Sequence, residues 1–181
     1  AKPIVVRAQR LGDVTLELKT VEGFAVVAPN WIFENLVIVG RCASDNDCEH
    51  AFHVVGAQNV VIRNNRVRNF NSAIKANGKN DRWPDGLLVE GNSFSNDAPR
   101  KTPYPVTTID VVGANEVRIV GNFIGDFAKA GGDRRSYAAF VKGNGANNRI
   151  ERNLVACEWQ HEGGFRAGLS LGGGGTGEQY C

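Results

Sequence analysis

Three residues that could do acid–base chemistry occupy equivalent positions in three similar segments of the chain. His53, Lys75 and Asp110 are each the third residue of a six-residue segment that ends in glycine. Cleavage of a uronic acid polymer by β-elimination needs a base, a group that neutralises the substrate carboxylate, and an acid for the leaving oxygen. We predict Lys75 or His53 as the base, with Asp110 tuning Lys75 or holding a sugar hydroxyl or a cation. A structural role is the alternative, because opposite charges on neighbouring strands stabilise a sheet by about 0.2–1 kcal/mol.

Other polar residues could border a groove for an anionic glycan. Asn77 lies one outward position beyond Lys75, and several basic residues fall in the variable segments between the repeats. The predicted substrate-binding residues are Asn77, Arg100, Lys101, Arg134 and Arg135. The aromatic residues that could stack on sugar rings are Trp83, Tyr104 and Phe140. Acidic residues are interleaved with the basic ones, so ordinary solvated loops are the alternative, and Trp83 before Pro84 could equally pack a turn.

The four cysteines predict two disulfides and an oxidising compartment. Cys42 and Cys48 are close enough to clip a loop, and Cys157 and Cys181 lie 24 residues apart, which is nearly one repeat. We therefore expect a secreted or periplasmic protein with the pairs Cys42–Cys48 and Cys157–Cys181.

The region around the first two cysteines raises the question of a metal. His50 and His53 lie near Cys42 and Cys48, but zinc is not expected there because oxidised thiols are not ligands. The segment 43–50 carries carboxylates suited to calcium, yet it lacks the spacing and the glycine of an EF-hand. We predict a disulfide-clipped surface loop and no metal or other cofactor, with calcium as the alternative.

The elements that position these residues follow from an internal repeat. Five short segments align, each reading as one strand that ends in glycine: AFHVVG (51–56), AIKANG (73–78), TIDVVG (108–113), AAFVKG (138–143) and GLSLGG (168–173). Alternation along a strand points one set of side chains inward. This inward set is Phe52, Ile74, Ile109, Ala139 and Leu169. The outward set is His53, Lys75, Asp110, Phe140 and Ser170, which would form one ladder at about 4.8 Å per step.

A second alignment sets the length of one coil. It comprises VVIRNNRV (60–67), LLVEGNSF (87–94), VRIVGNFI (117–124) and NRIERNLV (148–155), with Ile62, Val89, Ile119 and Ile150 inward. Asparagine follows three residues later in every copy, at Asn65, Asn92, Asn122 and Asn153, with spacings of 27, 30 and 31 residues. Stacked asparagines bond to the coils above and below. Two rows in register predict an all-β, right-handed parallel β-helix of about six to seven coils over residues 1–181, a single domain, and disfavour an antiparallel sandwich.

The opening of the chain resembles a known enzyme family. The stretches AKPIVVRAQRLGDVTLEL and VEGFAVVAPNWIFENLVIVG look like the early coils of the chondroitinase B and alginate lyase type of polysaccharide lyase, over roughly residues 2–40. The resemblance implies a β-helix, eliminative cleavage of an acidic polysaccharide, a lysine base, an arginine, and a calcium ion held by asparagine and glutamate. The site motifs of that family do not match this chain residue by residue.

The composition of the chain limits the classes of molecule that it could bind. The formal net charge of +2 and the lack of a basic stripe argue against nucleic acid, and no apolar run approaches the roughly 18 residues that cross a bilayer. Two functions remain open: a secreted carbohydrate-active enzyme acting as a polysaccharide lyase or hydrolase, or a non-catalytic solenoid that binds glycans or other surfaces. Neither end carries a polar cap, which predicts self-association or further coils at the open ends.

Overall fold

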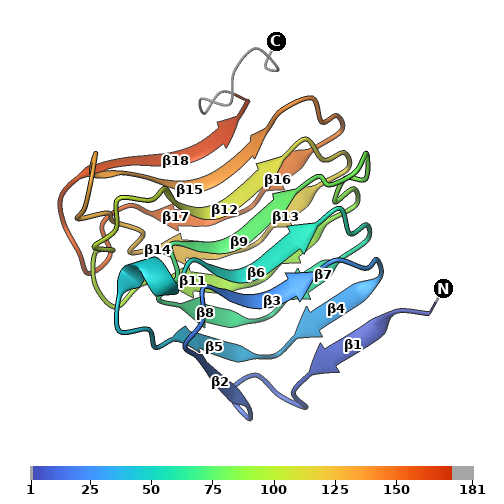
Figure 1. Cartoon of the computed structure of the whole chain (residues 1–181), viewed down its shortest axis with the longest axis horizontal. Coiled ribbons are helices and arrows are strands. Elements are labelled where there is room, and N and C mark those ends of the chain that lie inside the picture. Colours follow the sequence, from blue (N-terminus) through green and yellow to red (C-terminus); the bar gives the residue numbers. More distant parts are fainter. Residues whose placement is uncertain (1, 173–181) are drawn as a thin grey trace.

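The computed structural model describes residues 2–172 and is a parallel β-solenoid of six coils (Figure 1). Each coil contributes one strand to each of three six-stranded sheets, named here A, B and C, and every pairing between neighbouring strands is parallel. The helical structure in the described part of the chain is the short 3₁₀ turn Asp45–Asp47. The expected all-β parallel solenoid is confirmed, with six coils.

The strands of the three sheets follow one another in a fixed order around the coil. Sheet A contains β1 (Ile4–Arg7), β4 (Trp31–Glu34), β7 (Val61–Arg63), β10 (Leu88–Glu90), β13 (Arg118–Val120) and β16 (Arg149–Glu151). Sheet B contains β2 (Thr15–Leu18), β5 (Val37–Gly40), β8 (Arg66–Arg68), β11 (Ser93–Ser95), β14 (Phe123–Gly125) and β17 (Leu154–Ala156). Sheet C contains β3 (Glu22–Val26), β6 (His50–Val55), β9 (Ser72–Asn77), β12 (Val106–Val112), β15 (Arg135–Lys142) and β18 (Phe165–Leu171).

The predicted inward row of sheet C is present in the predicted register. Phe52, Ile74, Ile109, Ala139 and Leu169 are partners on successive strands. The first four are fully buried, whereas Leu169 is 47% exposed because it belongs to the last described coil. Ile62, Val89, Ile119 and Ile150 likewise pair in sheet A. Alternation along the strands therefore builds one continuous apolar core.

Each segment of the second alignment is two strands and not one. Residues 60–67 supply β7 to sheet A and β8 to sheet B, and the chain turns between them at Asn64, whose φ is +50°. The equivalent turn residues also have positive φ: Asn35, Gly91, Gly121 and Arg152. Asparagine and glycine tolerate this left-handed conformation best. The corner between sheets A and B is thus encoded in the sequence by Asn and Gly.

The asparagine row, defined as Asn65, Asn92, Asn122 and Asn153, lines the inside of that corner. Asn92 accepts the backbone N–H and the side-chain amide of Asn65 at 2.9 and 3.0 Å, and it donates to the Ile62 carbonyl at 2.8 Å and to Asn122 at 3.0 Å. Asn65 and Asn122 make the equivalent bonds one coil away in either direction. The predicted bonding to the coils above and below is confirmed.

The cysteines give one disulfide in the described residues. Cys42 and Cys48 are bonded, as predicted, and close the loop between β5 and β6. Cys157 is half-buried and has no disulfide partner within residues 2–172. Its expected partner, Cys181, lies outside the described residues. Over the described part of the chain, no helix is long and apolar enough to cross a membrane.

Candidate binding site on the outer face of sheet C

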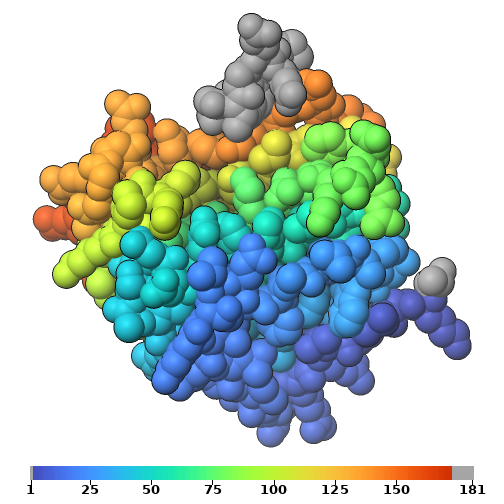
Figure 2. Space-filling model, in the orientation of Figure 1, coloured from blue at the N-terminus to red at the C-terminus, as the bar shows by residue number. Residues whose placement is uncertain are grey.

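The outer surface of sheet C is hollowed between two projecting segments. Sheet C faces the viewer in Figures 1 and 2, and the chain around residues 100 and 130 stands out at the left edge of this face. A depression of about 590 Å³, called here the sheet C hollow, lies over β9, β12 and β15 and is bordered by residues 103–106 and 129–135. Its charged lining residues are Lys75, Asp110, Lys129, Asp133, Arg135 and Lys142. Four cationic and two anionic side chains leave two positive charges in excess.

The predicted outward ladder of sheet C exists in the predicted order. His53 pairs with Lys75, Lys75 with Asp110, Asp110 with Phe140, and Phe140 with Ser170. Residues separated by 22 to 35 positions in the sequence thus become neighbours on adjacent strands. The hollow contains Lys75, Asp110 and Phe140, the middle part of this ladder.

Asp110 is the centre of a charge network on the floor of the hollow. Lys75 donates to Asp110 Oδ2 at 2.6 Å, and Lys142 Nζ lies 3.1 Å from Oδ1, off the direction of a hydrogen bond, as an ion pair. Asp110 is 7% exposed, and the Lys142 side chain only 8%, while Lys75 is 25% exposed. Two ammonium groups around one carboxylate leave a net positive floor, in which Lys75 is the more accessible cation.

An aromatic pair forms the next part of the floor. The rings of Tyr137 and Phe140 lie 4.2 Å apart, and Lys142 Nζ lies 5.1 Å from the Phe140 ring centroid, in a cation–π contact. Phe140 is buried, whereas Tyr137 remains half-buried and keeps one part of its ring in the hollow. An amphipathic ring with a wet edge is suited to contact with a sugar ring.

The bordering segment 129–135 is held in place by the hydrogen bonds of Lys129. Lys129 is buried and donates to the Pro103 carbonyl at 3.2 Å and to Asp133 at 2.8 Å. The hydrogen bond from Lys129 and the backbone N–H of Arg135 lower the pKa of the Asp133 carboxyl below its ordinary value. Lys129 therefore joins the two borders of the hollow, and Arg135 is the exposed cation at the rim.

His53 and Asn77 lie on the same sheet but in a different network. The His53 ring bonds Glu22 through Nδ1 at 2.6 Å and Asn77 through Nε2 at 2.8 Å. Neither residue lines the hollow. The structure thus separates His53 from Lys75 and Asp110 in terms of side-chain contacts, although the three backbones are adjacent.

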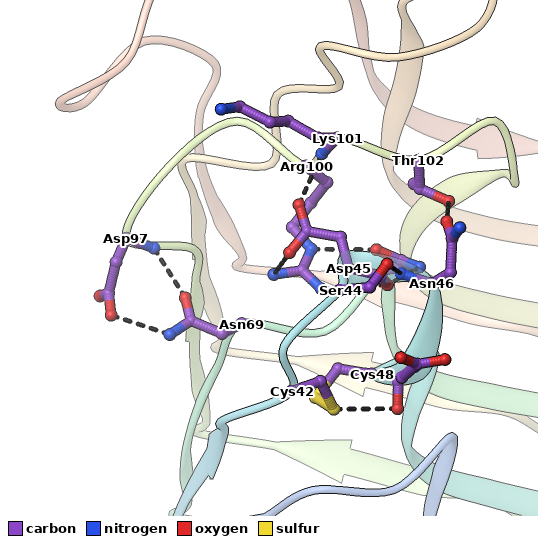
Figure 3. A network of polar contacts seen from close by, with 12 residues as sticks. Cys42, Ser44, Asp45, Asn46, Cys48, Asn69, Asp97, Arg100, Lys101 and Thr102 are labelled. Atoms are coloured by element: carbon purple, nitrogen blue, oxygen red, sulfur yellow. Dashed lines mark hydrogen bonds and ion pairs between the residues drawn. A yellow bond between two sulfur atoms is a disulfide. The ribbon is translucent and has the colours of Figure 1, made fainter.

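Arg100 and Lys101 contact the loop that the Cys42–Cys48 disulfide closes. Arg100 is 5% exposed, and its guanidinium lies 2.9 Å from Asp45 and donates to Asn71 at 2.9 Å, while the Lys101 N–H donates to Asp45 at 2.6 Å (Figure 3). Burial lowers the pKa of Arg100, and the charge of Asp45 opposes that shift. These contacts commit Asp45 to Arg100, which argues against calcium in this loop. The Arg100 side chain does not line the hollow, and Arg134 occupies an exposed turn with φ of +55°.

The aromatic residues predicted at sequence level have different roles. Trp83 covers two glycines: a Cβ at Gly78 or at Gly113 would lie 2.4 Å from its ring. It packs a turn, the alternative considered for it. Tyr104 is 48% exposed and is not in the lining of the hollow, whereas Phe140 is.

The lining residues that were not predicted include Tyr137 and Lys142. Lys142 sits two residues beyond Phe140, which is the place of Asn77 relative to Lys75, so the ladder itself could have indicated it. Tyr137 lies before the aligned segment, because β15 begins at Arg135 and is longer than the repeat.

Comparison with models of protein families, with curated proteins and with solved structures finds no match to this chain. The resemblance of residues 2–40 to polysaccharide lyases therefore has no support beyond the shared solenoid architecture, and the functional argument depends on the site alone.

Proposed function

We propose that the outer face of sheet C binds an acidic polysaccharide, with a uronate-containing segment seated in the sheet C hollow. The observation that carries this proposal is the combination of a positive floor, built by Lys75 and Lys142 around Asp110, with the Tyr137 ring beside it. Arg135 at the rim adds a planar guanidinium, which suits carboxylates and sulfates. The disulfide Cys42–Cys48 supports a secreted or periplasmic location, where such polymers occur.

Binding without chemistry accounts for the geometry of Lys75 better than catalysis does. A base in β-elimination must offer a free lone pair to the proton that it removes. The ammonium of Lys75 instead donates to Asp110 at 2.6 Å, and the imidazole of His53 is bonded at both nitrogens. Both groups are therefore occupied in the ligand-free protein, whereas a cation that faces a carboxylate on the substrate needs no rearrangement.

A second candidate is β-elimination itself, and the same charge network favours it. Lys142 can hold Asp110 when Lys75 turns toward a substrate, so Lys75 could act on the proton beside the uronate carboxylate. Arg135 would neutralise that carboxylate and Tyr137 could protonate the leaving oxygen. This candidate requires Lys75 to leave its salt bridge and to release its extra proton to solvent, so that the neutral amine can accept the proton of the substrate.

Affinity electrophoresis tests the binding proposal. Gels containing polygalacturonate, alginate, chondroitin sulfate or heparin should retard the protein, and a gel containing dextran, a neutral polymer, should not. We expect Arg135→Ala and Lys75→Ala each to weaken binding by about fivefold at low salt, because each removes one charge-assisted contact. Arg118→Ala removes an exposed positive charge from sheet A and should leave the mobility shift unchanged. Equal weakening by Arg118→Ala would mean nonspecific attraction and would overturn the proposal.

The ultraviolet absorbance of unsaturated uronate distinguishes the two candidates. Incubation with the same four polymers gives no rise in absorbance if the hollow only binds them. A rise that Lys75→Ala abolishes establishes elimination at this site, and a rise that survives Lys75→Ala places the chemistry elsewhere.

A further inference from the structure

Two histidines and a glutamate from the first two coils converge on the outer face of sheet C. Glu22 opens β3 and His50 opens β6, and the two residues are partners in the register of these strands, while His53 follows three positions later. The rings of His50 and His53 lie 5.0 Å apart at an angle of 70°. One ligand atom from each of the three residues lies within 4.8 Å of the other two, which is the single such group found among the described residues.

We infer that Glu22, His50 and His53 form a binding site for Zn²⁺ or a similar divalent transition-metal ion. Two imidazoles and one carboxylate are a ligand set that binds zinc in proteins with one coordination position left for water. Calcium is not expected, because it prefers six to eight oxygen ligands and this group offers two nitrogens. Neither Cys42 nor Cys48 takes part, because both are in the disulfide.

The hydrogen bonds of His53 prepare it to bind a cation. Asn77 donates its amide N–H to the Gly78 carbonyl at 3.1 Å, and this turns its Oδ1 toward His53 Nε2 at 2.8 Å. An amide oxygen only accepts, so Nε2 carries the hydrogen and Nδ1 faces Glu22 Oε1 at 2.6 Å. The 2.6 Å contact between Nδ1 and the Glu22 carboxylate, two acceptor atoms, requires a hydrogen between them, and a metal ion that takes the place of this hydrogen binds both atoms. Asn77 is thereby a positioning residue for this ligand.

His50 supplies the buried side of the site. Its side chain is only 12% exposed, and its Nδ1 has no hydrogen-bond partner, while its Nε2 lies 3.9 Å from Glu49. Burial lowers the pKa of His50 below its ordinary 6.5, which favours the neutral ring that metals require. An unpartnered nitrogen in a buried ring is costly, and coordination through it removes that cost.

Small movements are enough to assemble the site. Zinc–ligand bonds of about 2.0–2.1 Å place tetrahedral ligand atoms roughly 3.3 Å apart. The 2.6 Å contact between Glu22 and His53 must open, and the Glu22 side chain can move because it is 41% exposed. The ion would join the first coil to the second at the start of the solenoid. It lies on the same outer face as the sheet C hollow, but shares no lining residue with it.

Isothermal titration of the untagged, chelator-treated chain with ZnCl₂ tests the site, and CaCl₂ serves as the comparison. We expect one Zn²⁺ per chain and no heat from Ca²⁺. His50→Gln, His53→Gln and Glu22→Gln should each weaken Zn²⁺ binding by at least about tenfold. His161→Gln alters the third histidine of the chain, which lies outside this group, and should bind Zn²⁺ as the unaltered chain does.

Two further measurements keep the test decisive. Circular dichroism establishes that each variant is folded, and Glu22→Gln, at an exposed position, is the variant least able to disturb the fold. Co²⁺ in place of Zn²⁺ should give visible absorption that the unaltered chain and His161→Gln show and that His50→Gln loses. Absence of Zn²⁺ binding, or unchanged affinity in His50→Gln and His53→Gln, would overturn the inference.

Discussion

The asparagine row and the outer ladder of sheet C both run along the solenoid with one residue per coil, and they differ in how far the residue type is repeated. Asn65, Asn92 and Asn122 repeat one residue type inside the corner, and each amide bonds the coils before and after it. The outer ladder changes residue type at every step. Repetition of one side chain indicates a role in stacking, because each coil poses the same structural problem. The residue type of the outer ladder varies from coil to coil, which indicates that this surface is not needed for stacking the coils.

The largest effect is expected in the asparagine row. Asn92→Ala removes the partners of the Asn65 backbone N–H, the Asn65 and Asn122 amides and the Ile62 carbonyl in a buried corner. Unsatisfied buried groups cost about 1–3 kcal/mol each, so we expect a loss of about 3 kcal/mol or more in the free energy of unfolding. Urea denaturation measures it. Asn144→Ala, at an exposed position, is the matched control and should change stability by less than about 0.5 kcal/mol.

The outer ladder should be less costly to alter. Asp110→Asn removes the negative charge but keeps one oxygen that can accept from the ammonium groups, and Lys75 is 25% exposed and can turn to water, so we expect a loss of about 1–2 kcal/mol. Asp47→Asn, an exposed carboxylate, is the control in the same urea series. If Asp110→Asn lowers the free energy of unfolding as much as Asn92→Ala does, the outer ladder is as important for stability as the asparagine row, and the proposed distinction is wrong.

The pH dependence of stability tests the outer face near His50. The pKa of His50 is lowered in the folded protein, first by burial and further by His53, while Glu49 and Glu22 oppose the shift. The unfolded chain therefore takes up the proton first as the pH falls. The contribution of His50 is complete above its unfolded pKa of about 6.5 and is lost below it.

We accordingly expect the metal-free protein to become less stable as the pH falls from roughly 7.5 to 5.5, because His50 takes up a proton more readily in the unfolded chain. Thermal denaturation at the two pH values in the presence of a chelator measures this change. His50→Gln lacks the titrating ring and should lose less. An equal loss in His50→Gln would assign the pH dependence to other groups.

The smallest effect concerns the turn that follows each sheet A strand. Arg152 has a φ of +54° where the equivalent residues of earlier coils are Asn35, Asn64, Gly91 and Gly121. Arg152→Asn should stabilise the protein by about 0.5 kcal/mol, because asparagine tolerates this conformation better. A rise in the midpoint of thermal unfolding would confirm that this turn position prefers asparagine or glycine. A fall would show that Arg152 makes a contribution which the repeat does not require.

The features that repeat could be predicted from the sequence, and the features that occur once could not. The inward rows and the asparagine row recur in several coils, so their period shows the register. The two-strand nature of residues 60–67 was missed, because the segment was aligned as one strand although the polar residues 63–66 separate the inward Ile62 from the inward Val67. The ion pair of Arg100 with Asp45 spans 55 residues and joins two segments that lie outside any repeat.

The candidate sites illustrate the same limit. Lys75 and Asp110 were placed together by the alignment, and the structure brings them to 2.6 Å. Tyr137 escaped notice because it lies one residue before the aligned segment 138–143, although it belongs to β15. Glu22 could be linked to His50 only through the register of the first coil, which has no aligned glycine segment of its own.

A titration of ¹⁵N-labelled protein with short polygalacturonate oligomers, followed by heteronuclear NMR, tests most directly whether the outer face of sheet C is the binding surface. The account predicts that the largest chemical-shift changes occur at the backbone amides of Lys75, Asp110, Arg135, Tyr137 and Lys142. The amide resonances of sheets A and B should not change. Largest shifts on sheet A or sheet B, or no shifts with any acidic oligosaccharide, would contradict it.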